Sequence, residues 1–327
     1  MSCTLRTTEN IIMNWTRRCT IGLAALINLM LISGTPSAVA QENVVRMGYQ
    51  RVGAYALLKA RGMLEDRLKP LGYTVSWKEF SSGPQLLEGL KVGAVDFGHG
   101  GEAPPIFAQA AGAAFLYIGH EPPAPQGEAI LVPKDSPIKT IADLKGKKIA
   151  LNKGSNVHYL LVRALENAGL KYADVDVVFL SPTDGRASFD KGAVDAWVIW
   201  EPYRTAAEMS SGARTLADGS GLVSNHEFFF VTKSFAGGHP QVIDVVLSAA
   251  RDVYAEAAKD MAGTAKTFSV AAGFPTSVME VALSHRGFGV QPMSDLVVAD
   301  QQKIADAFKT LGLIPAAIYV SDAVRKP

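Results

Sequence analysis

Short apolar runs alternate with amphipathic stretches along the chain from residue 44 onward. Strand-like runs, which are brief and either apolar or alternating, occupy residues 44–49, 73–80, 94–97 and 115–119. Helical apolar spacing lies between them, at residues 56–61, 85–92 and 106–111. The order β-α-β-α-β-α-β predicts a largely parallel sheet with helices on its faces.

The same alternation recurs after a proline-rich break at residues 121–125. Strand patterns lie at residues 129–132, 148–151, 175–180 and 193–200, with helical patterns at 157–168 and after 181. A strand at 227–232 then leads into a mostly helical tail that includes 242–257 and 294–311. We therefore expect an α/β protein with two lobes, joined by two hinge strands, with the tail packed back on the first lobe.

The expected lobe boundaries follow from this reading. The first lobe comprises residues 41–130 and 230–327, and the second comprises residues 131–229. We expect the ligand to bind in the cleft between the lobes, because interdomain clefts and the carboxyl ends of parallel strands are favoured binding sites.

Residues 1–40 have the pattern of a signal peptide that is removed on export. Arg17 and Arg18 precede an apolar run at 21–32, and an A-x-A-like site predicts cleavage after Ala40. Either Met1 or Met13 is the start of the segment. The alternative is a membrane anchor, against which the run argues because it is shorter than the roughly 20 residues of a span. Export through this segment predicts a periplasmic protein.

Composition excludes several classes of function. The chain has 327 residues, is 48% hydrophobic and 19% charged, and carries a net charge of +1 without a basic stripe, so we expect no nucleic-acid partner. Both cysteines, Cys3 and Cys19, lie in the predicted signal peptide, so the exported chain would hold no thiol. The six histidines form no H-x-x-x-H or H-E-x-x-H pattern, so we expect no metal and no cofactor.

Four predicted helix starts are rich in Gly, Ser, Thr or Asn, at residues 81–85, 100–104, 154–156 and 183–186. Free backbone N–H groups at the positive end of a helix make an anion site. Each turn alone is equally consistent with an ordinary helix cap. Together they favour an oxyanion such as a sulfonate, sulfate, nitrate or phosphate, and phosphate fits worst because no P-loop is present and only Arg51 and Arg186 are available cations.

Other side chains near these turns complete the candidate site. Tyr55 and Trp200 could line an apolar part of the ligand, although strand aromatics often belong to the core. Glu102 and Glu201 could form a carboxylate pair across the cleft, or each could be solvated. With no Gly-x-Ser-x-Gly elbow and no placed nucleophile and base, the sequence predicts no catalytic residue.

From about residue 45 to 315 the chain resembles the periplasmic solute-binding components of aliphatic sulfonate ABC importers. The resemblance rests on residues 82–88, 104–112, 121–123, 136–140, 142–146, 153–155, 194–197 and 200–203. It implies a two-lobed periplasmic binding protein of type II, each lobe a mainly parallel sheet flanked by helices. It also implies a membrane permease and an ATP-hydrolysing subunit as partners, and we expect the protein itself to be a monomer.

The resemblance implies that the sulfonate is held by Ser82, Gly83, Gln85, Gly154 and Ser155, and also by Gln50 and Arg186. The chain departs from the family pattern at residues 98–102 and at Asn156. The full set of candidate ligand-binding residues is Gln50, Tyr55, Ser81, Ser82, Gly83, Gln85, His99, Gly100, Gly101, Glu102, Gly154, Ser155, Asn156, Asp184, Arg186, Trp200 and Glu201.

The predicted function is capture of an aliphatic sulfonate for import. The open alternatives are the same fold binding taurine, nitrate or a thiamine-pyrimidine precursor. An enzyme on this fold, such as a tetrapyrrole or pyrimidine-precursor synthase, is disfavoured by export and by the missing thiol. A sensor domain is disfavoured because no helix-turn-helix or stop-transfer segment is evident.

Overall fold

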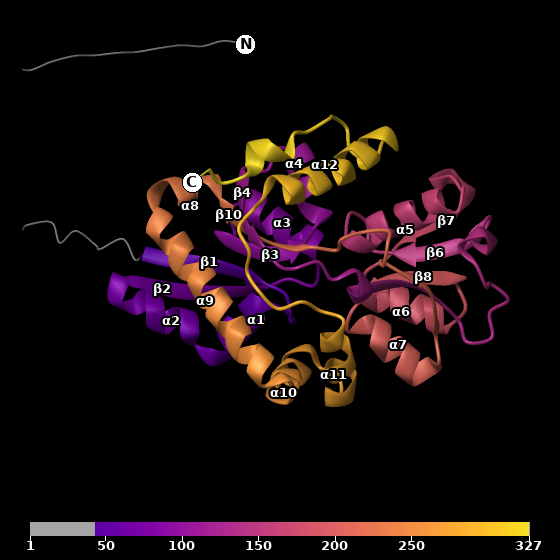
Figure 1. Ribbon diagram of the computed structural model, residues 1–327, viewed down its shortest axis with the longest axis horizontal. Helices are drawn as coiled ribbons and strands as arrows, with labels where there is room; N and C mark the ends of the chain where they lie inside the picture. Colours follow the sequence, from indigo (N-terminus) through magenta and orange to yellow (C-terminus); the bar gives the residue numbers. More distant parts are fainter. Residues whose placement is uncertain (1–42, 327) are drawn as a thin grey trace, which may run out of the picture. The chain divides into compact units, whose positions relative to one another are not determined.

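Two five-stranded sheets with helices on their faces organise residues 43–326, which are the residues that the computed structural model describes (Figure 1). The predicted signal peptide, its cleavage site and both candidate start methionines lie outside these residues. The prediction of an α/β fold built on two sheets is confirmed.

The first sheet has the strand order β2-β1-β3-β10-β4. Its strands are β1 (Asn43–Tyr49), β2 (Tyr73–Glu79), β3 (Phe97–Gly101), β4 (Phe115–His120) and β10 (Glu227–Thr232). Strand β1 runs parallel to β2 and β3, whereas β10 is antiparallel to both β3 and β4. The late strand β10 therefore fills the gap between two early strands.

The second sheet has the order β7-β6-β8-β5-β9. Its strands are β5 (Glu128–Val132), β6 (Lys148–Leu151), β7 (Asp176–Phe179), β8 (Ala196–Trp200) and β9 (Arg214–Asp218). Strand β6 is parallel to β7 and β8, and β5 is antiparallel to β8 and β9. Both sheets are thus mixed, not mainly parallel as predicted, because β10 in the first sheet and β5 in the second each run antiparallel to both of their neighbours.

Helices cover both faces of the first sheet. One face carries α1 (Ala54–Arg61), α2 (Met63–Leu68), α8 (Lys233–Gly238), α9 (Pro240–Lys259), α10 (Met261–Ala272) and α11 (Thr276–Ser284). The other face carries α3 (Gly83–Lys91), α4 (Pro104–Ala110) and α12 (Asp295–Thr310). The helices of the C-terminal tail therefore share cores with the first sheet (Figure 1).

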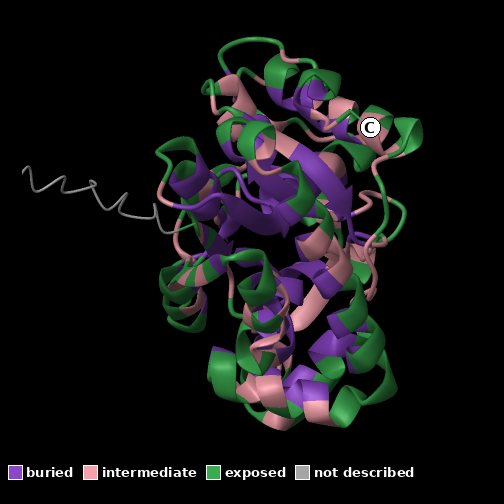
Figure 2. Cartoon of the chain, turned by 90° about the vertical axis from the view of Figure 1, so that its left-hand side faces the viewer, coloured by how far each residue is buried: buried purple, intermediate pink, exposed green. Residues whose placement is uncertain are grey.

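The second sheet is covered by α5 (Asn156–Asn167) on one face and by α6 (Pro182–Asp190) and α7 (Tyr203–Ser211) on the other. Short 3₁₀ helices occur at Lys69–Leu71, Pro125–Gly127, Ile141–Leu144, Tyr172–Asp174 and Val320–Ala323. Figure 2 shows buried strands inside and exposed helix faces outside. Within residues 43–326, no helix combines the length and the apolar character that crossing a membrane requires.

The packing of α3 on β3 shows how the sequence builds this core. Leu86, Leu87 and Leu90 are buried on one face of the helix, as the apolar spacing predicts. A Cβ atom added at Gly98 on β3 would lie 2.4 Å from Leu86 Cδ2 and 2.9 Å from Leu90 Cδ1. The missing side chain is therefore what lets the helix pack this closely on the strand.

We predict that Gly98→Ala destabilises the protein by about 1–3 kcal/mol, because the added methyl group overpacks a filled core. Urea unfolding followed by circular dichroism measures the change. The matched control is Gly237→Ala in α8, where nothing lies within 4 Å of the added Cβ atom. The control should leave stability unchanged or raise it slightly, and an equal loss in both variants would contradict the packing argument.

Candidate functional site

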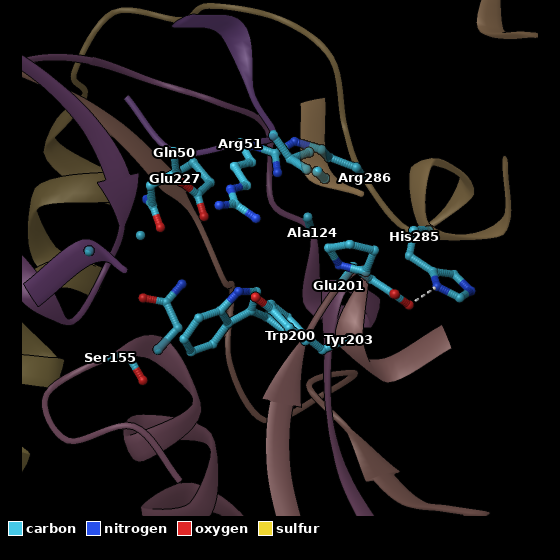
Figure 3. Close-up of a pocket in the computed structure, with 18 of the residues that line it drawn as sticks. Gln50, Arg51, Ala124, Ser155, Trp200, Glu201, Tyr203, Glu227, His285 and Arg286 are labelled. Carbon is cyan, nitrogen blue, oxygen red and sulfur yellow. Dashed lines mark hydrogen bonds and ion pairs between the residues drawn. The ribbon is translucent and has the colours of Figure 1, made fainter. Parts of the chain in front are cut away.

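A pocket of about 220 Å³ lies between the two sheets, where all four predicted helix starts contribute to one wall. The contributions are Ser81 and Gly83 at α3, Gly101 and Pro104 at α4, Ser155 and Asn156 at α5, and Thr183 at α6. Figure 3 shows Ser155, Trp200 and Tyr203 on one side of this space, with Gln50, Arg51 and Glu227 across from them. Turns more than 100 positions apart in the chain therefore meet at one pocket.

The starts of α3 and α5 offer backbone donors that their own serines do not use. Ser82 and Ser155 stand at the N-cap positions, yet neither side chain caps its helix. Ser155 Oγ donates instead to the carbonyl of Asn152, at 2.7 Å. By contrast, Ser181 does cap α6, where its Oγ accepts from Asp184 N at 3.2 Å. Because first-turn N–H groups have no intrahelical partner, those of α3 and α5 suit an anionic acceptor in the pocket.

Asn156 links the second sheet to the first. Through Asn225 it also contacts the two segments that connect the sheets, residues 121–127 and 219–226. Its Oδ1 accepts from Ala103 N at 3.2 Å, and its Nδ2 donates to Asn225 Oδ1 at 2.5 Å. Asn225 in turn donates through Nδ2 to the carbonyl of Ala124 at 2.8 Å, so the two connections are joined to each other. Gly101 makes room for this contact, since a Cβ atom there would lie 2.2 Å from Asn156 Oδ1.

Glu121 is the most enclosed charge at the pocket, with its side chain 2% exposed. His99 Nε2 lies 2.5 Å from its Oε1, Arg286 donates to its Oε2 at 3.0 Å, and the Tyr254 hydroxyl donates to Oε1. Burial alone would raise the pKa of Glu121, but Arg286 and His99 together hold that pKa below its ordinary value. Glu121 is therefore ionised and fully occupied by its protein partners.

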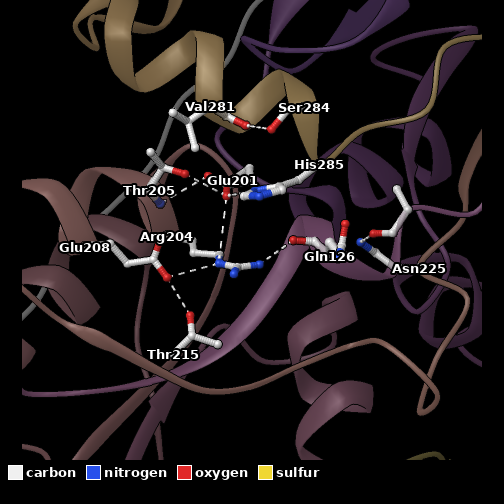
Figure 4. Close-up of polar contacts among 11 residues, drawn as sticks. Gln126, Glu201, Arg204, Thr205, Glu208, Thr215, Asn225, Val281, Ser284 and His285 are labelled. Atoms are coloured by element: carbon white, nitrogen blue, oxygen red, sulfur yellow. Dashed lines mark hydrogen bonds and ion pairs between the residues drawn. The ribbon is translucent and has the colours of Figure 1, made fainter.

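Glu201, at the end of β8, is likewise held by neighbours. Its Oε1 lies 2.8 Å from His285 Nδ1 and accepts from the Thr205 hydroxyl at 2.8 Å, while Oε2 accepts from Thr205 N at 3.2 Å. Figure 4 shows this group beside Arg204, which donates to the Gln126 carbonyl at 2.5 Å. The contact with His285 joins the second sheet to the segment after α11.

The structure places eight predicted site residues in the pocket wall: Gln50, Ser81, Gly83, Gly101, Ser155, Asn156, Trp200 and Glu201. The remaining predicted residues lie outside the wall: Tyr55, Ser82, Gln85, His99, Gly100, Glu102, Gly154, Asp184 and Arg186.

Each of these outer residues has a structural reason for its position. Tyr55 is buried in the core, 1% exposed, with its ring 5.7 Å from that of His99. Gln85 accepts the hydrogen bond of Ser81 Oγ at 2.8 Å. Arg186, on the exposed side of α6, donates to Asp190 at 2.6 Å and to the Ser210 hydroxyl at 2.8 Å.

The other predicted residues outside the wall are buried behind it or take part in local backbone structure. Ser82 is buried at the start of α3, and Gly100 pairs with Phe228 inside the first sheet. Gly154 has a φ of +72° and donates its N–H to His158 Nδ1 at 3.3 Å, which gives glycine a conformational role there. Asp184 accepts from the Ser181 hydroxyl at 2.7 Å.

Glu102 belongs to a second cavity, of about 480 Å³, between α12, α5 and residues 221–226. Its side chain is buried, with Oε2 accepting from His226 N at 2.9 Å and Oε1 without a partner among the described residues. Burial raises the pKa of Glu102 to about 8, with smaller opposing effects from backbone N–H groups. A carboxylate pair of Glu102 and Glu201 across one cleft is therefore not what the structure contains.

Several pocket residues were missed by sequence reasoning, above all Glu227, His285 and Arg286. Glu121 and Arg286 are 165 positions apart, so no local pattern could pair them. Glu121 stands in one of the motifs that carry the family resemblance, which was the one available signal. Within residues 43–326, no group of three or more His, Cys, Asp or Glu side chains could hold a metal ion.

We predict that Glu102→Gln becomes increasingly stabilising as pH rises. With a folded-state pKa of about 8, the folded protein keeps a proton that the unfolded chain releases near its ordinary value of 4.5. Wild-type stability should therefore fall between about pH 5 and about pH 8, whereas glutamine does not titrate. The advantage of the variant should grow by about 2–4 kcal/mol over this range in urea unfolding.

The control for this prediction is Glu88→Gln, because Glu88 is exposed on α3, with a lysine 3.8 Å away as its nearest charged partner. This variant removes an exposed charge, so it should not reproduce the growing stabilisation expected for Glu102→Gln. A pH-independent difference for Glu102→Gln would mean that Glu102 is ionised in the folded protein.

Comparison with known proteins places this arrangement in a family. The family model described as "NMT1/THI5 like" matches residues 75–262. The chain is 40% identical over 302 residues to the "Putative aliphatic sulfonates-binding protein" of Escherichia coli (strain K12), covering 91% of this chain and 94% of the relative. It is 30% identical over 186 residues to the "Taurine-binding periplasmic protein" of the same organism, covering 56% of this chain and 58% of the relative.

A solved structure agrees with these relatives. The alkanesulfonate-binding protein SsuA from Xanthomonas axonopodis pv. citri, bound to MOPS, superposes with a TM-score of 0.83 at 41% identity. The match covers 88% of this chain and 100% of that one, and it supports the two-lobed type II fold that was predicted. The family model matches more than half of the chain, and the 40% identical sulfonate-binding relative covers 91% of it, so this chain belongs to the NMT1/THI5-like family.

Proposed function

We propose that this protein is the solute-binding component of an ABC importer and that it captures an aliphatic sulfonate in the pocket between its sheets. The observation that carries this proposal is the convergence of four helix starts on one wall, two of them with N-cap serines that do not cap their helices. The similarity to sulfonate-binding proteins over nearly the whole chain supports the same assignment. Those relatives are binding proteins and not enzymes.

The chemistry of the wall suits a sulfonate head group. A sulfonate stays ionised at neutral pH and only accepts hydrogen bonds, so it matches first-turn N–H groups, hydroxyls and amides. Gly83 offers a backbone N–H and Gln50 a side-chain amide in the wall. The wall arginines are already paired, Arg51 with Glu79 at 2.7 Å and Arg286 with Glu121 at 3.0 Å. The anion is therefore held mainly by neutral donors.

An apolar tail has its own surface in the pocket. Trp200 ends β8 and Tyr203 begins α7. Across from them, Phe274, Met279 and Leu283 come from the region of α10 and α11. Tyr203 packs edge-on against Phe274, with ring centroids 5.2 Å apart. Because the two groups of side chains come from elements attached to different sheets, an alkyl chain between them would favour their approach.

The family membership implies a small ligand and a partnership with a permease and an ATPase. Our proposal adds that the protein acts as a monomer in the periplasm after cleavage following Ala40, without a nucleic-acid partner. The predicted lobes, residues 41–130 with 230–327 and residues 131–229, belong to this proposal. The pairing of all of β5 in the second sheet and all of β10 in the first supports moving each boundary to just before these strands.

Taurine is the second candidate ligand, because a taurine-binding periplasmic protein is among the relatives. Nitrate and a thiamine-pyrimidine precursor are less well matched by a pocket that combines helix-start donors with an apolar surface.

We predict that the mature protein binds linear alkanesulfonates with a dissociation constant near the micromolar range, about −8 kcal/mol. Isothermal titration calorimetry with butane-1-sulfonate tests this, with sulfate and nitrate as controls that lack a tail. Both controls should bind at least about tenfold more weakly, since they bury no alkyl surface. Heat with nitrate but with no sulfonate would reject the ligand class.

We also predict that Gly101→Ala lowers sulfonate affinity by about tenfold or more while the protein stays folded. The new methyl group would collide with Asn156 Oδ1 and disturb the contact that joins α5 to the first sheet. Calorimetry gives the affinity and circular dichroism gives the stability. Gly237→Ala, distant from the pocket, should bind like wild type, and unchanged affinity of Gly101→Ala would mean that this contact does not form in the bound state.

A further inference from the structure

Glu227 is the one pocket-wall carboxylate that no described side chain or backbone donor satisfies. The wall holds three glutamates, and the other two, Glu121 and Glu201, are each held by hydrogen bonds from their neighbours. The nearest charged partner of the Glu227 side chain within residues 43–326 is His99, with Nδ1 3.9 Å from Oε2, which is beyond hydrogen-bond distance. The side chain is 25% exposed and opens into the pocket.

The other charges of the wall do not neutralise this group. Arg51 is paired with Glu79 and Arg286 with Glu121, so each cation has its own carboxylate. His285 is engaged by Glu201. An ionised Glu227 therefore adds an uncompensated negative charge to a pocket whose helix starts attract an anion. For a purely anionic ligand this charge is unfavourable, and the affinity of the site would be higher without it.

The position of Glu227 separates it from the apolar end of the pocket. It begins β10 and lies opposite Gly101 in the register of β3. Figure 3 shows it beside Gln50 and Arg51, whereas Glu201 and His285 lie at the other end of the view. A ligand held by the helix starts can thus present a second polar group to Glu227 without crossing the apolar surface.

We propose that Glu227 binds the ammonium group of a zwitterionic sulfonate, so that the ligand of this protein is an aminoalkanesulfonate. This inference rests on the proposed function and specifies its ligand class. The free carboxylate and the ligand cation neutralise each other, while the helix starts hold the sulfonate. The negative charge of Glu227 weakens binding of an alkanesulfonate and strengthens binding of the aminated ligand, so it selects between them.

The charged surroundings of Glu227 determine how its contribution depends on pH. The groups that face it are His99 on β3, Glu121 and Arg286 at the pocket, Glu102 and Glu128 behind it, and Tyr254 on α9. Burial raises the pKa of Glu227 above its ordinary value, against opposing effects of His99 and Arg286. A bound ammonium favours the ionised form, whereas a bound anion favours the protonated form.

The test is a titration of the wild-type protein and of Glu227→Gln with ligand pairs that differ only by an ammonium in place of a methyl group. The pairs are taurine with propane-1-sulfonate, and 3-aminopropane-1-sulfonate with butane-1-sulfonate. In the wild type, at least one amino ligand should bind about tenfold or more tightly than its methyl partner. Glu227→Gln should abolish this preference and should strengthen binding of the alkanesulfonates.

The matched control is Glu88→Gln, which removes an equal charge from the exposed side of α3, the helix whose first turn lines the pocket. It should keep the wild-type preference within about twofold, since an exposed charge at a distance is screened.

The pH dependence of the wild type gives a second readout that needs no variant. As pH rises through the raised pKa of Glu227, affinity for the preferred aminoalkanesulfonate should increase because this carboxyl group ionises, and affinity for its methyl partner should fall or stay level. Groups that act on the shared sulfonate affect both members of a pair, so the ratio of the two affinities reports on the surroundings of the ammonium, which are Glu227 and the facing His99. Glu227→Gln should flatten this ratio.

The outcomes separate the two proposals. If no sulfonate binds at all, the proposed function is wrong. If alkanesulfonates bind, but neither amino ligand is preferred, or Glu227→Gln weakens both members of a pair equally, the role of Glu227 is overturned while the proposed function stands. A pH-independent ratio in the wild type would also overturn it.

Discussion

The buried carboxylate of Glu121 imposes the constraint on which the pocket depends. An ionised group with so little exposure must be paired, because leaving it without partners costs several kcal/mol. Its partners come from β3, from α9 and from the segment after α11, through His99, Tyr254 and Arg286. Its own backbone N–H donates to the carbonyl of Glu227 at 2.7 Å. One residue in the first connection thereby positions the C-terminal helices at the edge of the pocket.

Asn156 joins the second lobe to the first at the opposite wall of the pocket. It ties the start of α5 to Ala103 and to Asn225 through two hydrogen bonds. Each such bond contributes only about 0.5–1.5 kcal/mol net, which is small beside the binding energy of a micromolar ligand. The contacts of Glu121 within the first lobe are strong, whereas the hydrogen bonds of Asn156 between the lobes are weak. This combination is what a ligand needs in order to shift the population between two arrangements of the lobes.

Sequence reasoning recovered the local features and missed the ones that depend on distant partners. The strand at 227–232 and the helix starts at Ser81, Gly101 and Ser155 were predictable because apolar periodicity and turn residues are local signals. The antiparallel insertion of β10 was not, since pairing with β3 and β4 leaves no mark in its own residues. For the same reason Arg186 looked like a free cation, although Asp190 and Ser210 engage it, and Glu227 passed as an ordinary strand residue.

The insertion of the late strand β10 into the first sheet affects the order in which the two sheets can form. The second sheet is complete once residues 128–218 are present, because all its strands come from one continuous segment. The first sheet has a gap between β3 and β4 until β10 arrives, so its early strands must wait for a segment more than 100 residues further along. Closing such a long loop is slow relative to local pairing. In a chain that emerges from a membrane amino end first, the second sheet would therefore form before the first sheet is complete.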